Sequence, residues 1–327
     1  MILGIEIGGT KLQLGVGTGD DAKFEAFERY DVIPEQGAEG ILQQIRTSAQ
    51  GLMRRFDIQR IGFGFGGPVD GTAGRVITSH QINGWTGLPL VDWVQEKLNV
   101  AAVLGNDCDC AALAEARYGS GKGHRTVFYV TVGTGVGGGL VIDGRVHGTD
   151  RPAAAEIGHL RPGLIADDPH ATVESVASGW GIAATARACL MDEPNRPQDR
   201  LIPDGRPLLN DVHRRDLMER CGENPASLTT VMIGAAAAAG NDGARAILRS
   251  GTDTLGWAIA QVMALVDPDI VVVGGGVALL GDELFLDPLR EAVGRYLFPP
   301  IQGAYRLASP QLGEEVVVHG AIALGHQ

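Results

Sequence analysis

Glycine and threonine residues in two turns of this chain have the types and spacing needed to bind phosphate. Residues 127–132 have the β-branched and aromatic composition of a strand, and residues 140–142 predict a second strand. Because glycine lacks a Cβ and takes positive φ angles, successive backbone N–H groups between these strands can form a concave nest for an anion. Thr134 adds a hydroxyl donor. The glycines between the strands are Gly133, Gly135, Gly137, Gly138 and Gly139.

A shorter turn of the same kind stands near the start of the chain. Residues 2–7 and 12–16 predict two strands, and the turn between them is Gly8, Gly9, Thr10 and Lys11. One glycine turn between strands is more often only a turn. Two of them, one at the start of each half, favour two similar α/β lobes that present backbone amides to one polyphosphate.

A carboxylate stands at the end of a predicted buried strand. Residues 101–107 predict this strand, and residues 108–118 predict a helix of small residues. An open α/β sheet has its ligand crevice at the carboxyl ends of its strands, so Asp107 would face a ligand there. The same position suits a helix N-cap, and the spacing alone favours that role.

Acidic and imidazole side chains follow the second glycine turn. Glu156 and His159 are three residues apart, so they can face one direction and bind hydroxyl groups or a metal. Glu174 stands at a predicted helix start. Taken alone, the pair of Glu156 and His159 is more typical of an exposed surface than of a site.

The composition bounds the class of protein. A chain of 327 residues with 44% hydrophobic residues predicts about two domains with substantial cores. Its 39 acidic residues against 27 basic ones give a net charge of -12, which opposes binding to a phosphate backbone. We therefore expect no nucleic-acid partner.

Neither a leader nor a membrane segment is predicted. Residues 1–6 lack a basic region and lead directly into a strand, and no apolar run approaches the roughly 18 residues of a membrane helix. Four cysteines in a chain of this size predict reduced thiols rather than a disulfide framework. We expect a cytoplasmic protein with no membrane partner.

Further elements must position these side chains. The hydrophobic patterns predict strands over residues 23–32, 61–65 and 270–273, with a third glycine turn at Gly274, Gly275 and Gly276. Helices are predicted over residues 38–55, 229–239, 244–266 and the end of 316–324. Residues 191–225 form a polar excursion with room for one short helix.

Seven strings in this order resemble the ROK family of sugar kinases over nearly the whole chain. They are GIEIGGTK, GFGFGGPVD, GNDCDCAALAE, VTVGTGVGGGLVIDG, AAEIGH, VESVASG and DPDIVVVGGGV. The resemblance implies two ribonuclease H-like lobes of the actin-like ATPase superfamily, with the active site in the cleft between them. It divides the chain into residues 1–117, joined by the final helix at about 317–327, and residues 118–316.

The resemblance also implies an activity and its residues. ROK kinases transfer a phosphoryl group from ATP to a sugar hydroxyl, usually on carbon 6, and homodimers are common among them. By motif, Asp107 is similar to the general base and Glu6 to the carboxylate that holds Mg²⁺ through water. The sugar-binding positions are Gly67, Asn106, Glu156, His159 and Glu174. The ATP-binding positions are Gly8, Gly9, Thr10, Lys11, Gly133, Thr134, Gly135, Gly275 and Gly276.

Three departures from the family pattern bear on function. Glu6 replaces an aspartate, which adds a methylene beside the metal, and Gln81 replaces an asparagine upstream of Trp85. Many members also carry a cysteine-rich zinc loop after the EIGH histidine. Residues 160–173 contain no cysteine here, so we expect no zinc.

Two other functions stay open on these residues. A sugar sensor with weakened catalysis is suggested by Glu6 and the missing zinc loop, although Asp107 favours an enzyme. A glucokinase that uses inorganic polyphosphate is the second alternative. The sequence does not choose among hexoses and N-acetylated amino sugars, because epimers differ by a single hydrogen bond.

Overall fold

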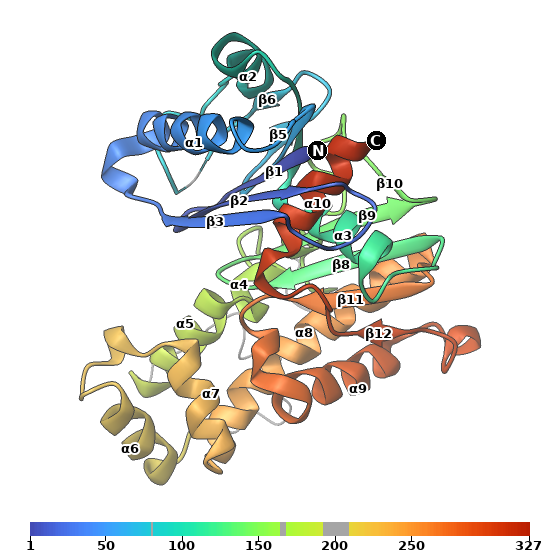
Figure 1. Ribbon diagram of the computed structural model, residues 1–327. Helices are drawn as coiled ribbons and strands as arrows, with labels where there is room; N and C mark the ends of the chain where they lie inside the picture. The colour runs from blue at the N-terminus through green and yellow to red at the C-terminus, as the bar shows by residue number, and fades with distance from the viewer. Residues whose placement is uncertain (80, 164–167, 192–208) are drawn as a thin grey trace.

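The computed structural model describes residues 1–79, 81–163, 168–191 and 209–327, which form two five-stranded sheets (Figure 1). In the first sheet the order is β3-β2-β1-β4-β7, with three antiparallel strands followed by two parallel ones. These strands are β1 Ile2–Ile7, β2 Lys11–Gly17, β3 Ala26–Asp31, β4 Arg60–Phe65 and β7 Ala101–Asn106.

The second sheet repeats this topology. Its order is β10-β9-β8-β11-β12, again an antiparallel meander followed by two parallel strands. The strands are β8 Thr126–Val132, β9 Val136–Ile142, β10 Arg145–Val146, β11 Ile270–Gly274 and β12 Leu307–Ala308. The predicted α/β class with two similar halves is confirmed.

Helices cover the outer face of each sheet. Figure 1 shows α1 and α2 over the first sheet and α8 and α9 beyond the second. The outer and peripheral helices are α1 Gly37–Met53, α2 Leu90–Leu98, α4 Val173–Ala177, α5 Gly179–Leu190, α6 Asp211–Arg220, α7 Thr230–Ala238, α8 Asp242–Val266 and α9 Asp287–Tyr296. A short hairpin of β5 Val69–Asp70 and β6 Arg75–Val76 completes the first half. No helix in the described part of the chain is long and apolar enough to cross a membrane.

Two helices lie between the sheets and pack against each other. Helix α3 (Asp107–Tyr118) packs on β8 and β9, and α10 (Val316–His326) packs on β1 and β4. A Cβ on Gly320 would collide with the backbone of Cys110, so the absence of a side chain at this position lets the two helix backbones approach closely. The guanidinium of Arg117 also donates to the carbonyl of Ala323 at 2.9 Å. The end of the chain is thus tied to its middle.

The second glycine turn is shorter than predicted. Only residues 133–135 connect the strands, because β9 already begins at Val136. The next three glycines lie within β9, where a Cβ on Gly139 would meet the backbone carbonyl of Cys108 and a Cβ on Gly137 its sulfur. Gly137 and Gly139 therefore let α3 pack closely on the sheet, whereas a Cβ on Gly138, which points to the other face, would meet the carbonyl of Ala155. The predicted amide nest across all five glycines is wrong, because three of them lie in the strand.

Other predicted elements agree closely with the structure. The helices predicted over 229–239 and 244–266 are α7 and α8, and α8 ends at Asp267 in the left-handed region (φ 48°). The only described α-helix within the polar excursion is α6, while residues 192–208 of that segment lie outside the described part. The division at residues 117 and 118 remains a prediction, since α3 contacts strands of both sheets.

The close approach of α3 and α10 gives the first testable prediction. We expect Gly320→Ala to lower the free energy of unfolding by about 1–3 kcal/mol, because the new methyl group forces the helices apart. The matched control is Gly51→Ala on α1, where a Cβ meets nothing within 4 Å. That change should raise stability by about 0.5–1 kcal/mol, since alanine favours helix. Urea unfolding measures both, and equal effects would show that the helices do not meet backbone to backbone.

Candidate active site

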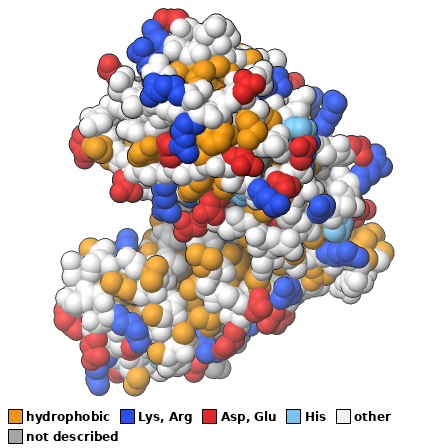
Figure 2. Space-filling model, in the orientation of Figure 1, with side chains coloured by type: hydrophobic (Ala, Val, Ile, Leu, Met, Phe, Trp, Pro, Cys, Tyr) orange, Lys and Arg blue, Asp and Glu red, His pale blue; other side chains and the backbone are white. Residues whose placement is uncertain are grey.

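A cavity of about 820 Å³ lies where the two halves meet, and it brings together residues from both sheets. Figure 2 shows the molecule hollowed on this side, between the half that holds the first sheet and the half that holds α5 and α7. The residues that line the cavity include Glu6, Lys11, Arg29, Asp107, Cys108, Gly275, Gly276 and Glu314. Its lining therefore combines a carboxylate at a helix start, two cations and a glycine turn.

Asp107 is the first residue of α3, but it is not the helix cap. The side chain of Asn106 caps the helix, with Oδ1 accepting from the N–H groups of Cys108 at 2.8 Å and Asp109 at 3.4 Å. The alternative of an Asp107 N-cap is thus wrong, because β7 ends one residue earlier than predicted. Asp107 is left to face the cavity, with Oδ1 accepting from the Cys108 N–H at 2.9 Å.

Burial raises the pKa of the Asp107 carboxyl above its ordinary value, although the hydrogen bond from the Cys108 N–H acts in the opposite direction. A carboxylate with a raised pKa is a stronger proton acceptor. Asn106 also donates from Nδ2 to the carbonyl of Gly67 at 3.0 Å. The structure therefore places three of the predicted site residues, Gly67, Asn106 and Asp107, side by side.

Glu156 lies within electrostatic reach of the other predicted sugar-binding side chains. Burial raises the pKa of the Glu156 carboxyl, His159 lowers it, and Asp107 and Glu174 raise it further. His159 is exposed at the end of a short 3-10 helix, and its backbone N–H donates to the backbone carbonyl of Glu156 at 3.1 Å. These four side chains thus belong to one electrostatic cluster.

Glu174 has a structural contact that the sequence did not reveal. It lies in the first turn of α4, and Oε2 accepts from the Val136 N–H at 2.9 Å. A Cβ on Gly135 would collide with the same oxygen. Glu174 therefore braces the second glycine turn with one carboxylate oxygen and leaves Oε1 for other contacts.

The three glycine turns differ in how they meet the cavity. Gly275 has a φ of 93° and lies against the backbone of Val132, and the Val277 N–H donates to the Val132 carbonyl at 2.8 Å. This contact places the third turn beside the end of β8, where the second turn begins. Within the described lining, Gly275 and Gly276 are present, while the predicted contacts Gly8, Gly9, Thr10, Gly133, Thr134 and Gly135 are not.

Gln81 lies against the first glycine turn. A Cβ on Gly9 would overlap the Gln81 side chain, so the two positions are in direct contact. The Gly8 N–H closes the turn by donating to the Lys11 carbonyl at 3.0 Å. The residue that departs from the family pattern therefore touches the predicted phosphate turn.

Glu6 is buried at the floor of the cavity and has the oxygen chemistry of a magnesium ligand. Its Oε1 lies 3.6 Å from Lys11 Nζ, while Oε2 has no hydrogen-bond partner among the described residues. Burial raises its pKa to about 7, Lys11 lowers it and Asp107 raises it. Mg²⁺ binds one or two carboxylates, phosphate oxygens and water, so the unpaired oxygen fits a hydrated ion.

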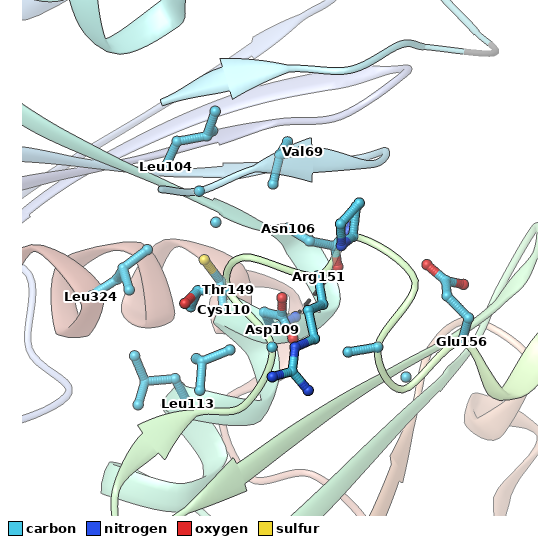
Figure 3. A pocket seen from close by; sticks show the side chains of 17 residues that line it. Val69, Leu104, Asn106, Asp109, Cys110, Leu113, Thr149, Arg151, Glu156 and Leu324 are labelled. Atoms are coloured by element: carbon cyan, nitrogen blue, oxygen red, sulfur yellow. Dashed lines mark hydrogen bonds between the residues drawn. The ribbon is translucent and has the colours of Figure 1, made fainter. Parts of the chain in front are cut away.

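A small cavity of about 20 Å³ lies beneath the start of α3 and has room for about one water molecule (Figure 3). Asn106, Asp109, Arg151 and Glu156 are among its lining residues. Burial raises the pKa of Asp109 to about 7, and Asp107 and Glu156 raise it further. Sequence reasoning missed Asp109. The only signal was a second acid two residues after Asp107, in a segment that had to be buried.

The raised pKa of Asp109 gives a prediction on stability. The unfolded chain loses this proton near pH 4, while the folded protein keeps it to about pH 7, so stability falls as pH rises through this window. Asp109→Asn removes the titration. We expect its Tm to exceed that of the unchanged protein by at least about 2 °C at pH 8, and the difference to vanish towards pH 4.

The control for this prediction is Asp143→Asn. The Arg125 guanidinium lowers the pKa of the exposed Asp143, so its contribution to stability is present at neutral pH and lost in acid. We therefore expect that Asp143→Asn does not raise the Tm at any pH. If Asp109→Asn raises the Tm equally at pH 4 and at pH 8, the charge of Asp109 is not the cause of the gain, and the prediction is refuted. Calorimetry from pH 4 to pH 8 measures both variants.

Comparisons with known proteins agree on one family. The model of the ROK family matches residues 2–327. A glucokinase from Streptomyces coelicolor is 30% identical over 336 residues, covering 100% of this chain and 98% of its own. A ROK family glucokinase from Streptomyces griseus, solved in complex with glucose and AMPPNP, is 28% identical with a TM-score of 0.78 and covers 100% and 99% of the two chains.

A ROK hexokinase from Thermus thermophilus is 27% identical, with a TM-score of 0.79 over 99% of this chain and 97% of that one. The architecture is accordingly the two-lobed, ribonuclease H-like fold of the actin-like ATPases. With a match over nearly every residue and relatives of the same length, the chain belongs to the ROK family.

Proposed function

We propose that this chain, a sugar kinase of the ROK family, transfers the γ-phosphoryl group of ATP to the 6-hydroxyl of a hexose or an N-acetylated amino sugar. The observation that carries the proposal is the position of Asp107, which lines the large cavity together with the Gly275 turn and two cations. The Streptomyces griseus relative binds glucose and an ATP analogue. In this proposal the nucleotide lies on the side of Gly275 and Gly276, and the sugar lies beside Asn106 and Glu156.

Asp107 acts as the general base in the proposed reaction. Its carboxylate accepts the proton of the sugar hydroxyl as the oxygen attacks the γ-phosphorus, and its raised pKa strengthens this role. Asn106 contributes mainly by capping α3 and fixing Gly67, which leaves one of its Nδ2 hydrogens for the sugar. Glu156, His159 and the free oxygen of Glu174 bind the remaining hydroxyl groups.

Phosphoryl transfer also requires that developing negative charge be offset. Lys11 and Arg29 line the cavity and provide fixed positive charge there. Glu6 would hold Mg²⁺ through water, and the ion, when bound, offsets charge on the phosphate oxygens. The amides of the glycine turns orient the phosphates. Cytoplasmic location and a homodimer remain predictions within this proposal.

The central test of the proposal is Asp107→Asn. Because Asn106 caps α3, the change should leave the fold intact, and sugar affinity should persist through the other ligands. Loss of a positioned base costs about 10²–10⁴ in rate, so we expect turnover on the best sugar to fall at least about a hundredfold. ADP release across a panel of hexoses and amino sugars, with sugar affinity by calorimetry, provides the measurement.

The matched control is Asp92→Asn, an exposed aspartate in the first turn of α2. It should leave turnover unchanged. Near-normal turnover for Asp107→Asn would remove the base from the proposal. Sugar binding by the unchanged protein without ADP release, on any sugar, would favour the sensor instead, and release of shortened polyphosphate would favour the alternative donor.

The absence of cysteine from residues 160–173 gives a prediction on metal content. We expect the purified protein to contain no stoichiometric zinc and to regain full activity after chelation once Mg²⁺ is restored, because the cysteine ligands are missing and the two remaining histidines, His159 and His170, are too few protein ligands for a zinc site. Elemental analysis measures this directly. About one zinc per chain, together with activity that only zinc restores, would show that other ligands replace the cysteines.

A further inference from the structure

A row of three polar side chains crosses the first sheet beneath the start of α10. Glu6 on β1 lies directly opposite Gln13 on β2, and Gln13 lies directly opposite Arg29 on β3. Residues opposed in this way project from the same face, with Cβ atoms about 4.5–5.5 Å apart. Glu6 and Arg29 both line the large cavity, and Gln13 lies between them.

Gln13 is fully buried, with 0% of its surface exposed. Among the described residues neither its Nε2 nor its Oε1 has a hydrogen-bond partner. The adjacent Glu6 has the complementary feature, since its Oε2 is buried and unpaired as well. Buried polar groups are almost always paired, so three orphaned atoms on two opposed residues indicate an arrangement that is completed in another state of the site.

The outer atoms of the two charged neighbours already have partners. Lys11 Nζ lies 3.6 Å from Glu6 Oε1, and Arg29 donates from one terminal nitrogen to Glu314 Oε2 at 3.0 Å. Arg29 carries further N–H donors, and the inner oxygen of Glu6 is free. The Gln13 side chain has an NH₂ donor, which suits the Glu6 carboxylate, and a carbonyl acceptor, which suits the Arg29 guanidinium.

We propose that Gln13 is a positioning residue that fixes the Glu6 carboxylate when a metal–nucleotide complex occupies the cavity. In that state Gln13 Nε2 donates to Glu6 Oε2, and Gln13 Oε1 accepts from Arg29. All three orphaned atoms are then paired by side-chain rotation alone. The proposal rests on the proposed function for the identity of the ligand, which is a divalent cation with a nucleoside triphosphate.

Glutamate at position 6 makes such a partner useful. Compared with aspartate, its side chain has one more rotatable bond, so its carboxylate is less defined unless another group holds it. Hydrogen-bond partners of metal-holding carboxylates typically change metal affinity or activity by about 10–100-fold when they are removed. Gln13 can supply this restraint from inside the sheet, where it does not compete with the ligand for space.

The experiment replaces Gln13 by methionine, which keeps the length and flexibility of the side chain but removes both polar groups. We expect the Mg²⁺ concentration for half-maximal activity to rise about tenfold, with the KM for sugar unchanged. Calorimetry should show a smaller gain in ATP affinity on adding Mg²⁺, with metal-free ATP binding unaffected. The Tm should not fall, since orphaned polar atoms are removed. Gln43→Met on the exposed side of α1 serves as the control.

A general packing role would predict a different outcome. If Gln13→Met lowers Tm and weakens ATP equally with and without Mg²⁺, or leaves the Mg²⁺ dependence unchanged, the positioning role is refuted. NMR of the unchanged protein supplies a readout that does not need turnover. The Gln13 side-chain amide signal, identified by its loss in Gln13→Met, should shift when Mg²⁺ is added to the ATP-bound protein, and no shift would also refute the proposal. Failure to bind ATP or to phosphorylate any sugar would instead overturn the proposed function.

Discussion

The close packing of α3 against α10 between the two sheets determines where the site residues stand. Gly320 allows the backbones to approach at Cys110, and the glycines of β9 allow α3 to lie directly on the second sheet. Since Asp107 begins α3 and Glu6 lies on a strand covered by α10, this contact fixes the distance between the candidate base and the candidate metal ligand. A side chain at these glycines would separate the parts of the site as well as destabilise the fold.

The electrostatics of the site follow from this geometry. Glu6, Asp107, Asp109 and Glu156 all have raised pKa values, and burial is the largest cause for each. The charge of Asp107 adds to the effect at Glu6, Asp109 and Glu156, and Lys11 is the principal cation that opposes it at Glu6. A cluster of buried acidic side chains is a poor place for a polyphosphate alone. It suits a polyphosphate that arrives with a divalent cation beside a neutral sugar.

Much of the fold could be predicted from the sequence because its strands are short, apolar and bounded by glycine. The errors arose where one residue type served two purposes. The sequence predicts a ligand-binding turn through Gly137 and Gly139, although these two glycines lie in β9 and allow α3 to pack on it, and only the partner helix reveals this. The boundary between β7 and α3 shifted by one residue, which moved the cap from Asp107 to Asn106.

The site itself was predictable to the extent that its residues lie in motifs. Gly67, Asn106 and Asp107 come together because they lie at the carboxyl ends of β4 and β7, which are parallel neighbours. Glu156 lines the small cavity with Asn106 but reaches it from the segment after β10. The sequence does not reveal Asp109 or Gln13, since the role of Asp109 depends on its burial and that of Gln13 on its unpaired atoms. The hydrogen bond from the Val136 N–H to the Glu174 carboxylate joins residues 38 positions apart, and the sequence of neither segment indicates it.

The most direct test of the central claim, that Asp107 acts on a sugar beside Asn106 and Glu156 while Glu6 acts on a nucleotide in the large cavity, is a crystal structure with glucose and a non-hydrolysable ATP analogue. We predict a sugar hydroxyl within hydrogen-bond distance of the Asp107 carboxylate, and the terminal phosphate between that hydroxyl and the side of Glu6 and Lys11. A sugar bound out of reach of Asp107, or a nucleotide bound outside this cavity, would contradict it.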